Sequence, residues 1–277
     1  MAVHDQAGDV VTIDDRIAQI VHSLQTASDI SVPIAQRLQT HTIYVLDQSL
    51  VRVHMPIASL IDHTLLKADA TPAQIEQLCA EAQAYGFASV CVNPMYVPLC
   101  VQLLDDSRVM IGTVIGFPLG ATTTATKVYE TRQALMDGAH EVDMMLAIGR
   151  LKAGDYAYVL DDLTQVVETV HAAGATCKVI IETALLNDDE KITACLLAWS
   201  VRADYVKTST GFAGGGATVD DVALMARIVG PSVGVKASGG IRTRADAYAL
   251  IMAGATRIGS SAGVQMVQEA SSINASL

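Results

Sequence analysis

The sequence predicts an α/β protein that folds as a closed (β/α)8 barrel, a TIM barrel, with a helical N-terminal extension. From about residue 58 of the 277-residue chain, short apolar runs alternate eight times with segments of helical periodicity. The runs are rich in Val and Ile and apolar nearly throughout, which is typical of parallel strands covered on both faces. Eight strand-helix units in succession favour a closed barrel.

The expected strands and helices alternate in the following order. The strands lie in segments 58–66, 88–94, 109–117, 141–149, 176–186, 204–210, 232–240 and 256–263. The first helix is expected at 71–86, and the second ends near Asp106. The others are expected at 122–138, 155–174, 187–203, 218–230, 243–254 and after 263. Thr71 and Pro72 form a good N-cap and first helical position. Five helices are expected to end at glycines: Gly86, Gly138, Gly174, Gly230 and Gly254.

An open doubly wound sheet is the main alternative architecture. Such a sheet normally has fewer strands and carries a nucleotide-binding loop after its first strand. The sequence has no GxGxxG between the first strand and helix, and no GxxxxGK[ST]. The barrel is therefore the better prediction.

Residues 1–54 stand apart from this alternation. The apolar residues of a first expected helix recur at helical spacing: Ile13, Ile17, Ile20, Val21 and Leu24. A second helix is expected after Pro33, through Ile34, Leu38 and Val45. We interpret this segment as an extension that covers the barrel bottom or joins a subunit contact, with the barrel domain over residues 55–277.

Composition and charge exclude several classes of function. Hydrophobic residues make up 51% of the chain and charged residues 17%, which is enough for a large core. A formal charge of -11 gives no basic footprint for nucleic acid, and no apolar run approaches the ~18 residues of a membrane span. The first thirty residues carry several aspartates and no apolar signal segment. We expect a cytoplasmic protein with no nucleic-acid or membrane partner.

The cysteines and histidines predict neither disulfides nor a metal site. The five cysteines are scattered and odd in number: Cys79, Cys91, Cys100, Cys177 and Cys195. Free thiols in a reducing compartment are therefore expected. The seven histidines include no HExxH and no close pair, so nothing in the sequence indicates zinc.

The residues expected at the catalytic end of the barrel include two lysines. Catalytic groups of such barrels come from the C-terminal strand ends, which here carry Asp62, His63, Cys91, Asn93, Asp143, Lys178, Glu182, Lys207 and Lys236. Alternation along the strands points Lys207 and Lys236 inward, because valines occupy the opposite faces. Two inward, partly desolvated lysines on adjacent strands would lower each other's pKa. A partly neutral lysine is a nucleophile for carbonyl groups.

The competing interpretation is that these lysines are structural and form ion pairs with Asp143 and Glu182. For any one buried lysine, that interpretation would be preferred. Two lysines on neighbouring strand ends, both followed by glycine-rich loops, favour catalysis instead.

Three glycine-rich loops follow the last three strands, with the sequences STGFAGGG, SGGIRT and GSSAG. Glycines let backbone N–H groups approach an anion closely, and a helix N-terminus adds a favourable partial charge. Barrels frequently bind phosphate after strands seven and eight. Any single glycine is more often a plain turn residue, but three such loops in succession predict a phosphate site.

Eight motifs in order along residues 58–265 resemble the deoxyribose-phosphate aldolase family. They are IDHTLL, CVNP, IGFPLG, EVDMML, KVIIETALL, YVKTSTGF, VKASGGIRT and RIGSSAG. The resemblance implies a class I aldolase that reversibly cleaves 2-deoxy-D-ribose 5-phosphate to acetaldehyde and D-glyceraldehyde 3-phosphate. It also implies small phosphosugar and aldehyde substrates, no metal or organic cofactor, and a homo-oligomer, either a dimer or a tetramer.

Carried over by position, the resemblance implies roles for individual residues. Lys207 looks like the Schiff-base lysine, Lys236 like the second lysine that lowers its pKa, and Asp143 like the proton-transfer carboxylate. The family's phosphate-binding loops correspond to Thr210, Gly211, Gly239, Gly240, Gly259, Ser260 and Ser261. Supporting positions are Asp62, Lys178, Glu182 and Cys91.

The supporting residues have simpler interpretations beside these roles. Lys178 and Glu182 are expected to form an internal ion pair, and Cys91 to be a packing thiol. Asp62 is as well explained by a structural role as by one beside the site.

The chain departs from the family's usual pattern at Ala262, at Ala147 and at its C-terminus, which lacks a tyrosine. These departures bear on rate and phosphate affinity, not on the reaction class. Two other functions remain open on the sequence alone. One is a different Schiff-base aldolase or transaldolase, and the other is a catalytically silent barrel that binds a sugar phosphate as a sensor.

Overall fold

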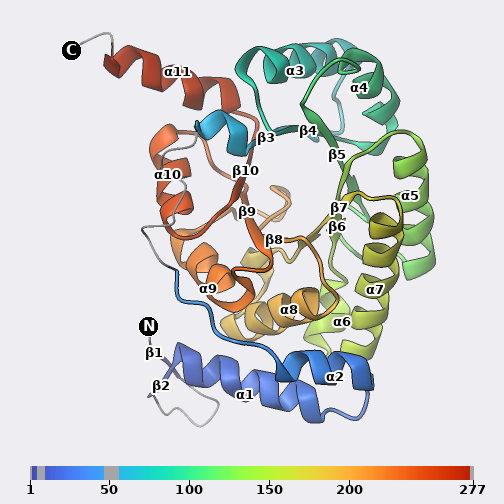
Figure 1. The fold of residues 1–277 in the computed structure, drawn as a ribbon, viewed down its shortest axis with the longest axis vertical. Helices are drawn as coiled ribbons and strands as arrows, with labels where there is room; N and C mark the ends of the chain where they lie inside the picture. Colours follow the sequence, from blue (N-terminus) through green and yellow to red (C-terminus); the bar gives the residue numbers. More distant parts are fainter. Residues whose placement is uncertain (1, 5–9, 47–55, 275–277) are drawn as a thin grey trace.

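The computed structural model describes residues 2–4, 10–46 and 56–274, and its centre is a closed barrel of eight parallel strands (Figure 1). The strands pair in chain order, and the last closes the barrel on the first. They are β3 Ile61–Leu65, β4 Ser89–Val92, β5 Met110–Ile115, β6 Glu141–Met145, β7 Thr176–Ile180, β8 Tyr205–Lys207, β9 Gly234–Ser238 and β10 Arg257–Ser260. Each lies inside its predicted segment, so the predicted TIM barrel is confirmed.

A helix follows every strand and covers the outside of the barrel (Figure 1). The helices are α3 Pro72–Tyr85, α4 Val97–Leu103, α5 Thr124–Met136, α7 Tyr156–Ala172, α8 Asp188–Ser200, α9 Val219–Val229, α10 Arg244–Met252 and α11 Gly263–Asn274. Three 3-10 turns, Ile57–Leu60, Pro94–Tyr96 and Thr183–Leu185, lie in the connections. The expected start of α3 is confirmed, because Thr71 forms a capping box with Gln74.

One short helix was not predicted. The fourth strand ends at Met145, and α6, Ile148–Lys152, begins within the segment assigned to that strand. The run Leu146-Ala147-Ile148 is apolar, and a short apolar run does not distinguish a strand from a buried helical turn.

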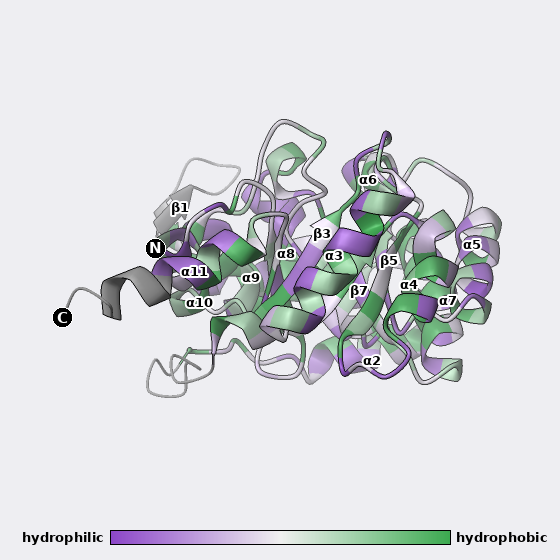
Figure 2. Cartoon of the chain, turned by 90° about the horizontal axis from the view of Figure 1, so that it is seen from above, coloured by the Kyte–Doolittle hydropathy of each residue, from purple (hydrophilic) through white to green (hydrophobic). Residues whose placement is uncertain are grey.

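The two faces of the strands differ in chemistry. Outward residues such as Val179, Val206 and Val235 are buried in the apolar core between the strands and the helices. The helices themselves carry both hydrophobic and hydrophilic residues (Figure 2). The inner face instead carries Lys178, Lys207 and several carboxylates, each at most 3% exposed. Charges buried this deeply require partners, so the barrel interior must contain ion pairs.

The N-terminal segment packs on the outer helices. Its elements are an unpredicted antiparallel pair, β1 Ala2–His4 and β2 Val10–Thr12, then α1 Ile13–Thr26 and α2 Val32–Gln39. Both helices lie outside α8 (Figure 1), where Arg16 pairs with Asp189 of α8. Asp14 pairs with Arg227 of the next helix, α9. The predicted boundary between residues 54 and 55 lies outside the described residues.

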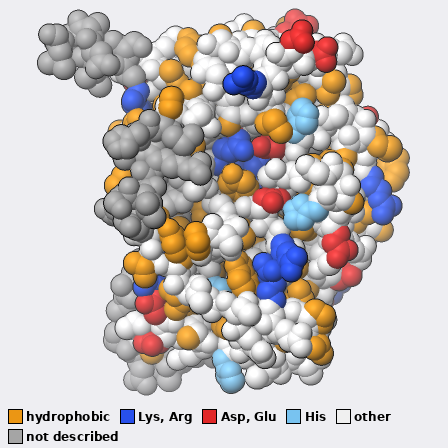
Figure 3. All heavy atoms as spheres, in the orientation of Figure 1, with side chains coloured by type: hydrophobic (Ala, Val, Ile, Leu, Met, Phe, Trp, Pro, Cys, Tyr) orange, Lys and Arg blue, Asp and Glu red, His pale blue; other side chains and the backbone are white. Residues whose placement is uncertain are grey.

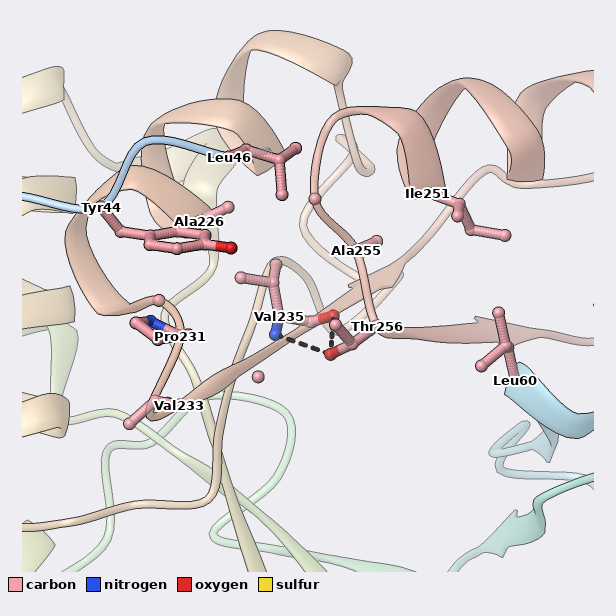
Figure 4. Close-up of a pocket in the computed structure, with 13 residues that line it drawn as sticks. Tyr44, Leu46, Leu60, Ala226, Pro231, Val233, Val235, Ile251, Ala255 and Thr256 are labelled. Atoms are coloured by element: carbon pink, nitrogen blue, oxygen red, sulfur yellow. Dashed lines mark hydrogen bonds between the residues drawn. The ribbon is translucent and has the colours of Figure 1, made fainter. Parts of the chain in front are cut away.

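The second N-terminal helix is shorter than predicted, and the chain beyond it reaches the bottom of the barrel. α2 ends at Gln39, and Val45 is an exposed residue beyond it. Tyr44 donates its backbone N–H to the Arg227 carbonyl at the end of α9 (2.8 Å). Figure 4 shows Tyr44 and Leu46 over a small apolar cavity beside the start of β9 and the residues just before β10. Extended chain, not helix, therefore covers this edge of the barrel.

The loop after β5 makes a close backbone contact that only glycine permits. Gly120 has a φ of +67°, and a Cβ there would lie 1.9 Å from the Leu146 carbonyl oxygen. Gly154 has a similar φ of +72°, but a Cβ there would meet nothing within 4 Å. The two glycines therefore separate backbone strain from steric clash.

We expect Gly120→Ala to destabilise the protein more than Gly154→Ala. Both substitutions add about 1 kcal/mol of left-handed strain, and only the first adds about 1–3 kcal/mol of overpacking. The comparison is made by thermal unfolding of the two variants beside the unsubstituted protein. Equal losses of Tm would contradict the proposed contact.

Candidate active site

The C-terminal strand ends bring the two predicted lysines side by side. Lys207 ends β8, and Lys236 is its direct register partner in β9. Both point into the barrel and are almost fully buried, at 2% and 1% exposed. The inward direction that strand alternation predicts for both is therefore confirmed.

A single carboxylate, Asp143 of β6, joins three lysines. Its Oδ2 accepts from Lys207 Nζ (2.8 Å) and from Lys236 Nζ (2.7 Å). Its Oδ1 accepts from Lys178 Nζ at 3.0 Å. Asp204, the acidic residue nearest to Lys207 in sequence, binds His171 and the Cys177 backbone N–H instead. The fold supplies Lys207 with a carboxylate from a strand 64 residues away in sequence.

A second tier of ion pairs lies deeper in the barrel and was not predicted. Arg257, the first residue of β10, donates to Asp62 Oδ1 (2.7 Å) and to Glu141 Oε1 (2.8 Å). Glu141 also accepts from Lys178 (2.7 Å), and Asp62 Oδ2 pairs with Lys236 at 2.5 Å. Arg257 and Glu141 each begin a strand, where sequence analysis does not look for catalytic groups.

The charges of this network hold its carboxylates ionised. Burial alone would raise the pKa of Asp143, but Lys178, Lys207 and Lys236 together hold it well below its usual range. Burial likewise opposes ionisation of Asp62, and Lys236 and Arg257 lower its pKa. Both carboxylates are therefore anions at neutral pH.

The same charges correct one expectation about Lys236. Burial would lower the pKa of this amine, as the sequence analysis predicted, but Asp143 and Asp62 raise it well above its usual value. The prediction considered the neighbouring lysine but could not see that two carboxylates face Lys236. Lys236 is therefore a cation at neutral pH.

The expected ion pair between Lys178 and Glu182 does not form. Lys178 binds Glu141 and Asp143 instead, because it lies opposite Asp143 in the register of β6 and β7. Glu182 lies beyond the end of β7 with a φ of 56°, in the left-handed region, which breaks the alternation that placed it beside Lys178. Its Oε2 accepts from the Thr210 backbone N–H (3.0 Å) and from the Thr210 hydroxyl. Glu182 thus fixes the loop after β8.

A cavity of about 280 Å³ opens above Lys207. All seven predicted phosphate-loop residues line it: Thr210, Gly211, Gly239, Gly240, Gly259, Ser260 and Ser261. Lys67 and Arg242 line it too, and the sequence analysis did not single them out. Arg242 lies in the SGGIRT motif itself, so a search of the glycine-rich loops for cations could have found it.

Two hydroxyls of these loops are already engaged within the protein. Thr210 donates to Glu182, and Ser260 donates to the Ile241 carbonyl (2.7 Å) and accepts from the Ala262 N–H (2.9 Å). Ser261 is an exposed residue at the cavity. The loops therefore offer mainly backbone groups, Ser261 and the two cations to a ligand.

The remaining predicted residues lie around this network. Cys91 of β4 is buried with Leu66 and Val114, and burial raises the pKa of its thiol. His63 points away from the lysines and pairs through Nε2 with Glu81 (2.7 Å). At the rim, the Phe117 and Phe212 rings meet edge to face, with centroids 5.4 Å apart.

Three further observations concern membrane spans, metal binding and surface charge. None of the helices among the described residues is long and apolar enough to cross a membrane, and within these residues no group of three His, Cys, Asp or Glu side chains could hold a metal ion. On the face in Figure 3, Lys and Arg side chains are interspersed with acidic and hydrophobic ones.

The chain is similar to aldolase sequences over most of its length. A family model described as DeoC/LacD family aldolase matches residues 57–269. The chain is 58% identical over 212 residues to deoxyribose-phosphate aldolase 1 of Bacillus licheniformis, which spans 76% of this chain and 95% of that protein. It is 59% identical over 214 residues to the deoxyribose-phosphate aldolase of Carboxydothermus hydrogenoformans, which spans 76% of this chain and 94% of that protein.

A solved structure agrees with these sequence matches. The tetrameric deoxyribose phosphate aldolase from Aeropyrum pernix superposes with a TM-score of 0.75 at 34% identity, over 82% of this chain and 96% of that one. The chain therefore belongs to the DeoC/LacD family of aldolases, and its activity is that of a lyase.

Proposed function

We propose that this chain is a deoxyribose-phosphate aldolase that works through a Schiff base on Lys207. One observation supports this proposal most directly. The described ion-pair network contains four cations, and Lys207 is the one that also lines the cavity formed by the glycine-rich loops. Lys178, Lys236 and Arg257 are held among carboxylates below it. Of these four cations, Lys207 is the one placed to reach a carbonyl carbon in the cavity.

The proposed reaction begins with the neutral amine of Lys207. It attacks C1 of the open-chain 2-deoxy-D-ribose 5-phosphate, and loss of water gives an iminium ion. The iminium withdraws electrons, so the C2–C3 bond breaks once the C3 hydroxyl loses its proton, and D-glyceraldehyde 3-phosphate leaves. The remaining enamine is protonated at C2, and water then releases acetaldehyde and regenerates Lys207. A silent sugar-phosphate sensor would give no borohydride adduct, and a different Schiff-base aldolase would give the adduct but would not cleave deoxyribose 5-phosphate.

Asp143 is the proposed proton carrier of this sequence. Its Oδ2 is shared by Lys207 and Lys236 in the free protein, so the carboxylate lies within hydrogen-bond distance of the reacting nitrogen. Once the Lys207 nitrogen is bound to the substrate, Asp143, directly or through a water, can take the C3 hydroxyl proton. Lys236 remains charged and keeps the carboxylate in position.

The glycine-rich end of the cavity is the proposed site for the substrate phosphate. Gly211, Gly239 and Gly240 adopt positive φ angles of 87°, 90° and 76° there, and a Cβ on Gly239 would lie 3.0 Å from Gly216 Cα in the neighbouring loop. Lys67 and Arg242 lie at the same cavity, and α11 begins at Gly263, close after Ser261. Backbone amides, two cations and a helix N-terminus are the groups that bind phosphate in proteins.

The proposal extends to assembly, domain division and location. We propose a homo-oligomer, dimer or tetramer, since the α5 side chains Tyr129 and Met136 are 71% and 74% exposed on one side of that helix. Residues 1–54 are proposed as a helical extension of the barrel domain at 55–277. The five free, buried cysteines are consistent with the proposed cytoplasmic location.

Lys207→Ala should abolish covalent trapping of acetaldehyde by borohydride reduction, and with it aldol cleavage. Lys152→Ala is the matched control, because Lys152 is a surface lysine paired with Glu190. Peptide mass spectrometry of the reduced protein locates the adduct. An adduct that persists in the Lys207 variant would refute the Schiff-base assignment.

Lys236→Leu should move the pH optimum of cleavage to higher pH. The substitution removes a cation beside Lys207 and leaves Asp143 Oδ2 to Lys207 alone, so the nucleophilic amine keeps its proton to higher pH. The measurement is kcat/KM for deoxyribose 5-phosphate across a pH series. An unchanged profile would remove this role from Lys236.

Arg242→Ala should raise KM for deoxyribose 5-phosphate roughly 10-fold, the loss expected for one charge-assisted contact of about 1.5 kcal/mol. The KM for unphosphorylated deoxyribose should stay unchanged, because that sugar has no phosphate to bind. A coupled assay of both sugars with both proteins makes the comparison. Equal effects on both sugars would argue against phosphate binding at Arg242.

A further inference from the structure

We propose that Arg257 and Glu141, deep in the barrel and away from the cavity, set a charge balance that makes Lys207 the amine that gives up its proton. The inference rests on the proposed function, since it concerns the nucleophile named there. Both residues are positioning groups in this scheme and touch no substrate. Nothing in the glycine-rich loops is needed for their effect.

The ion-pair network inside the barrel contains one more cation than anions. Ion pairs link the cations Lys178, Lys207, Lys236 and Arg257 to the carboxylates Asp62, Glu141 and Asp143. All four side chains of lysine and arginine in this set are at most 13% exposed, and those of the carboxylates at most 3%. With every group ionised, the set has a net charge of +1. A surplus charge in a dry interior is unfavourable, and loss of one proton removes it.

The contacts determine which cation is the surplus one. Arg257 binds two carboxylates and does not deprotonate in proteins. Lys178 binds Glu141 and Asp143, and Lys236 binds Asp143 and Asp62. Lys207 has one carboxylate oxygen, which it shares with Lys236. Lys207 is therefore the lysine with the fewest carboxylate contacts, and it is the one to which we assign the surplus charge.

Arg257 causes this distribution of partners. By occupying Asp62 Oδ1 and Glu141 Oε1, it neutralises charge that the lysines would otherwise share. Without Arg257 the set would contain three cations and three carboxylates, and every lysine could keep its proton. Glu141 acts in the opposite direction, because removing its charge leaves four cations against two carboxylates.

Other groups around the network do not alter this comparison. Tyr205 of β8 lies beneath the Lys178 and Arg257 cations, with its ring centroid 5.9 and 5.7 Å from them. The Cys91 thiol of β4 faces the interior, and burial raises its pKa. β5 carries no titratable side chain.

Three charged residues lie above the network. Lys67 and Arg242 line the cavity, where they are exposed, and buried Glu182 bonds to Thr210. Their charges are the same in every variant below, so the predicted differences between variants do not depend on them.

The test measures the pH at which Lys207 becomes reactive. Acetaldehyde and cyanoborohydride label Lys207 only when its amine is neutral, and peptide mass spectrometry gives the labelling rate at Lys207 across a pH series. Arg257→Met should move the rising limb to higher pH by about one unit, the shift that a unit charge ~10 Å away causes at an effective dielectric constant of about 20. Glu141→Gln should move it to lower pH.

Two further variants separate charge balance from packing damage. Arg257→Lys keeps the charge and should leave the limb near that of the unsubstituted protein. The double variant Arg257→Met/Glu141→Gln restores a surplus of one cation, so its limb should return towards the original pH although two side chains are changed. Arg150→Met, at a surface arginine paired with Asp155, is the matched control and should not move the limb.

The outcomes separate this inference from the proposed function. Opposite shifts in the two single variants, with return in the double variant, support the charge balance. Labelled protein whose limb stays fixed in both single variants overturns it and leaves the Schiff base intact. If Arg257→Met does not fold, Glu141→Gln alone still decides by the sign of its shift. Absence of any label on Lys207 in the unsubstituted protein would instead refute the proposed function.

Discussion

The structure depends on one buried carboxylate, Asp143, and on the three lysines that surround it. Each of these charges would be unstable alone in the barrel interior, where removing an ion from water has an effective penalty of several kcal/mol. Together they link β6, β7, β8 and β9 through contacts of 2.7 to 3.0 Å. Replacing a buried ion pair with apolar residues is often neutral or stabilising, so stability alone does not explain so many charges. The proposed role of Lys207, a reactive amine held at a fixed place, accounts for them.

The sequence predicts the barrel well because the rules involved are local and repeated. Runs of Val and Ile mark the strands, and period-two alternation fixes which side chains point inward. The positions of Lys207 and Lys236 follow directly, because the parallel register places them side by side. The glycine-rich loops likewise converge on one cavity, since all of them follow neighbouring strands.

The partners of these charges are harder to predict, because they depend on distances across the barrel. Nothing near Lys236 in sequence indicates that Asp62 and Asp143 both face it. For this reason the predicted direction of the Lys236 pKa shift was wrong. Alternation also failed at Glu182, where a left-handed residue turns the chain out of the strand. Arg257 was missed for a different reason. It lies at the start of its strand, but its long side chain reaches the interior carboxylates of β3 and β6.

The sign of the interior charge also bears on how an acidic protein can accept the anionic substrate proposed above. The whole chain carries a formal charge of -11, which repels a phosphosugar at long range, although physiological salt screens exposed charges beyond about 8 Å. Inside that distance the substrate meets Lys67, Arg242 and the backbone of the glycine-rich loops. The surplus cation below them acts in the same direction until Lys207 loses its proton. Binding of the phosphate adds negative charge near Lys207 and so favours the protonated amine. The fixed cations Lys236 and Arg257 must therefore outweigh that effect if the amine of Lys207 is to stay neutral in the complex.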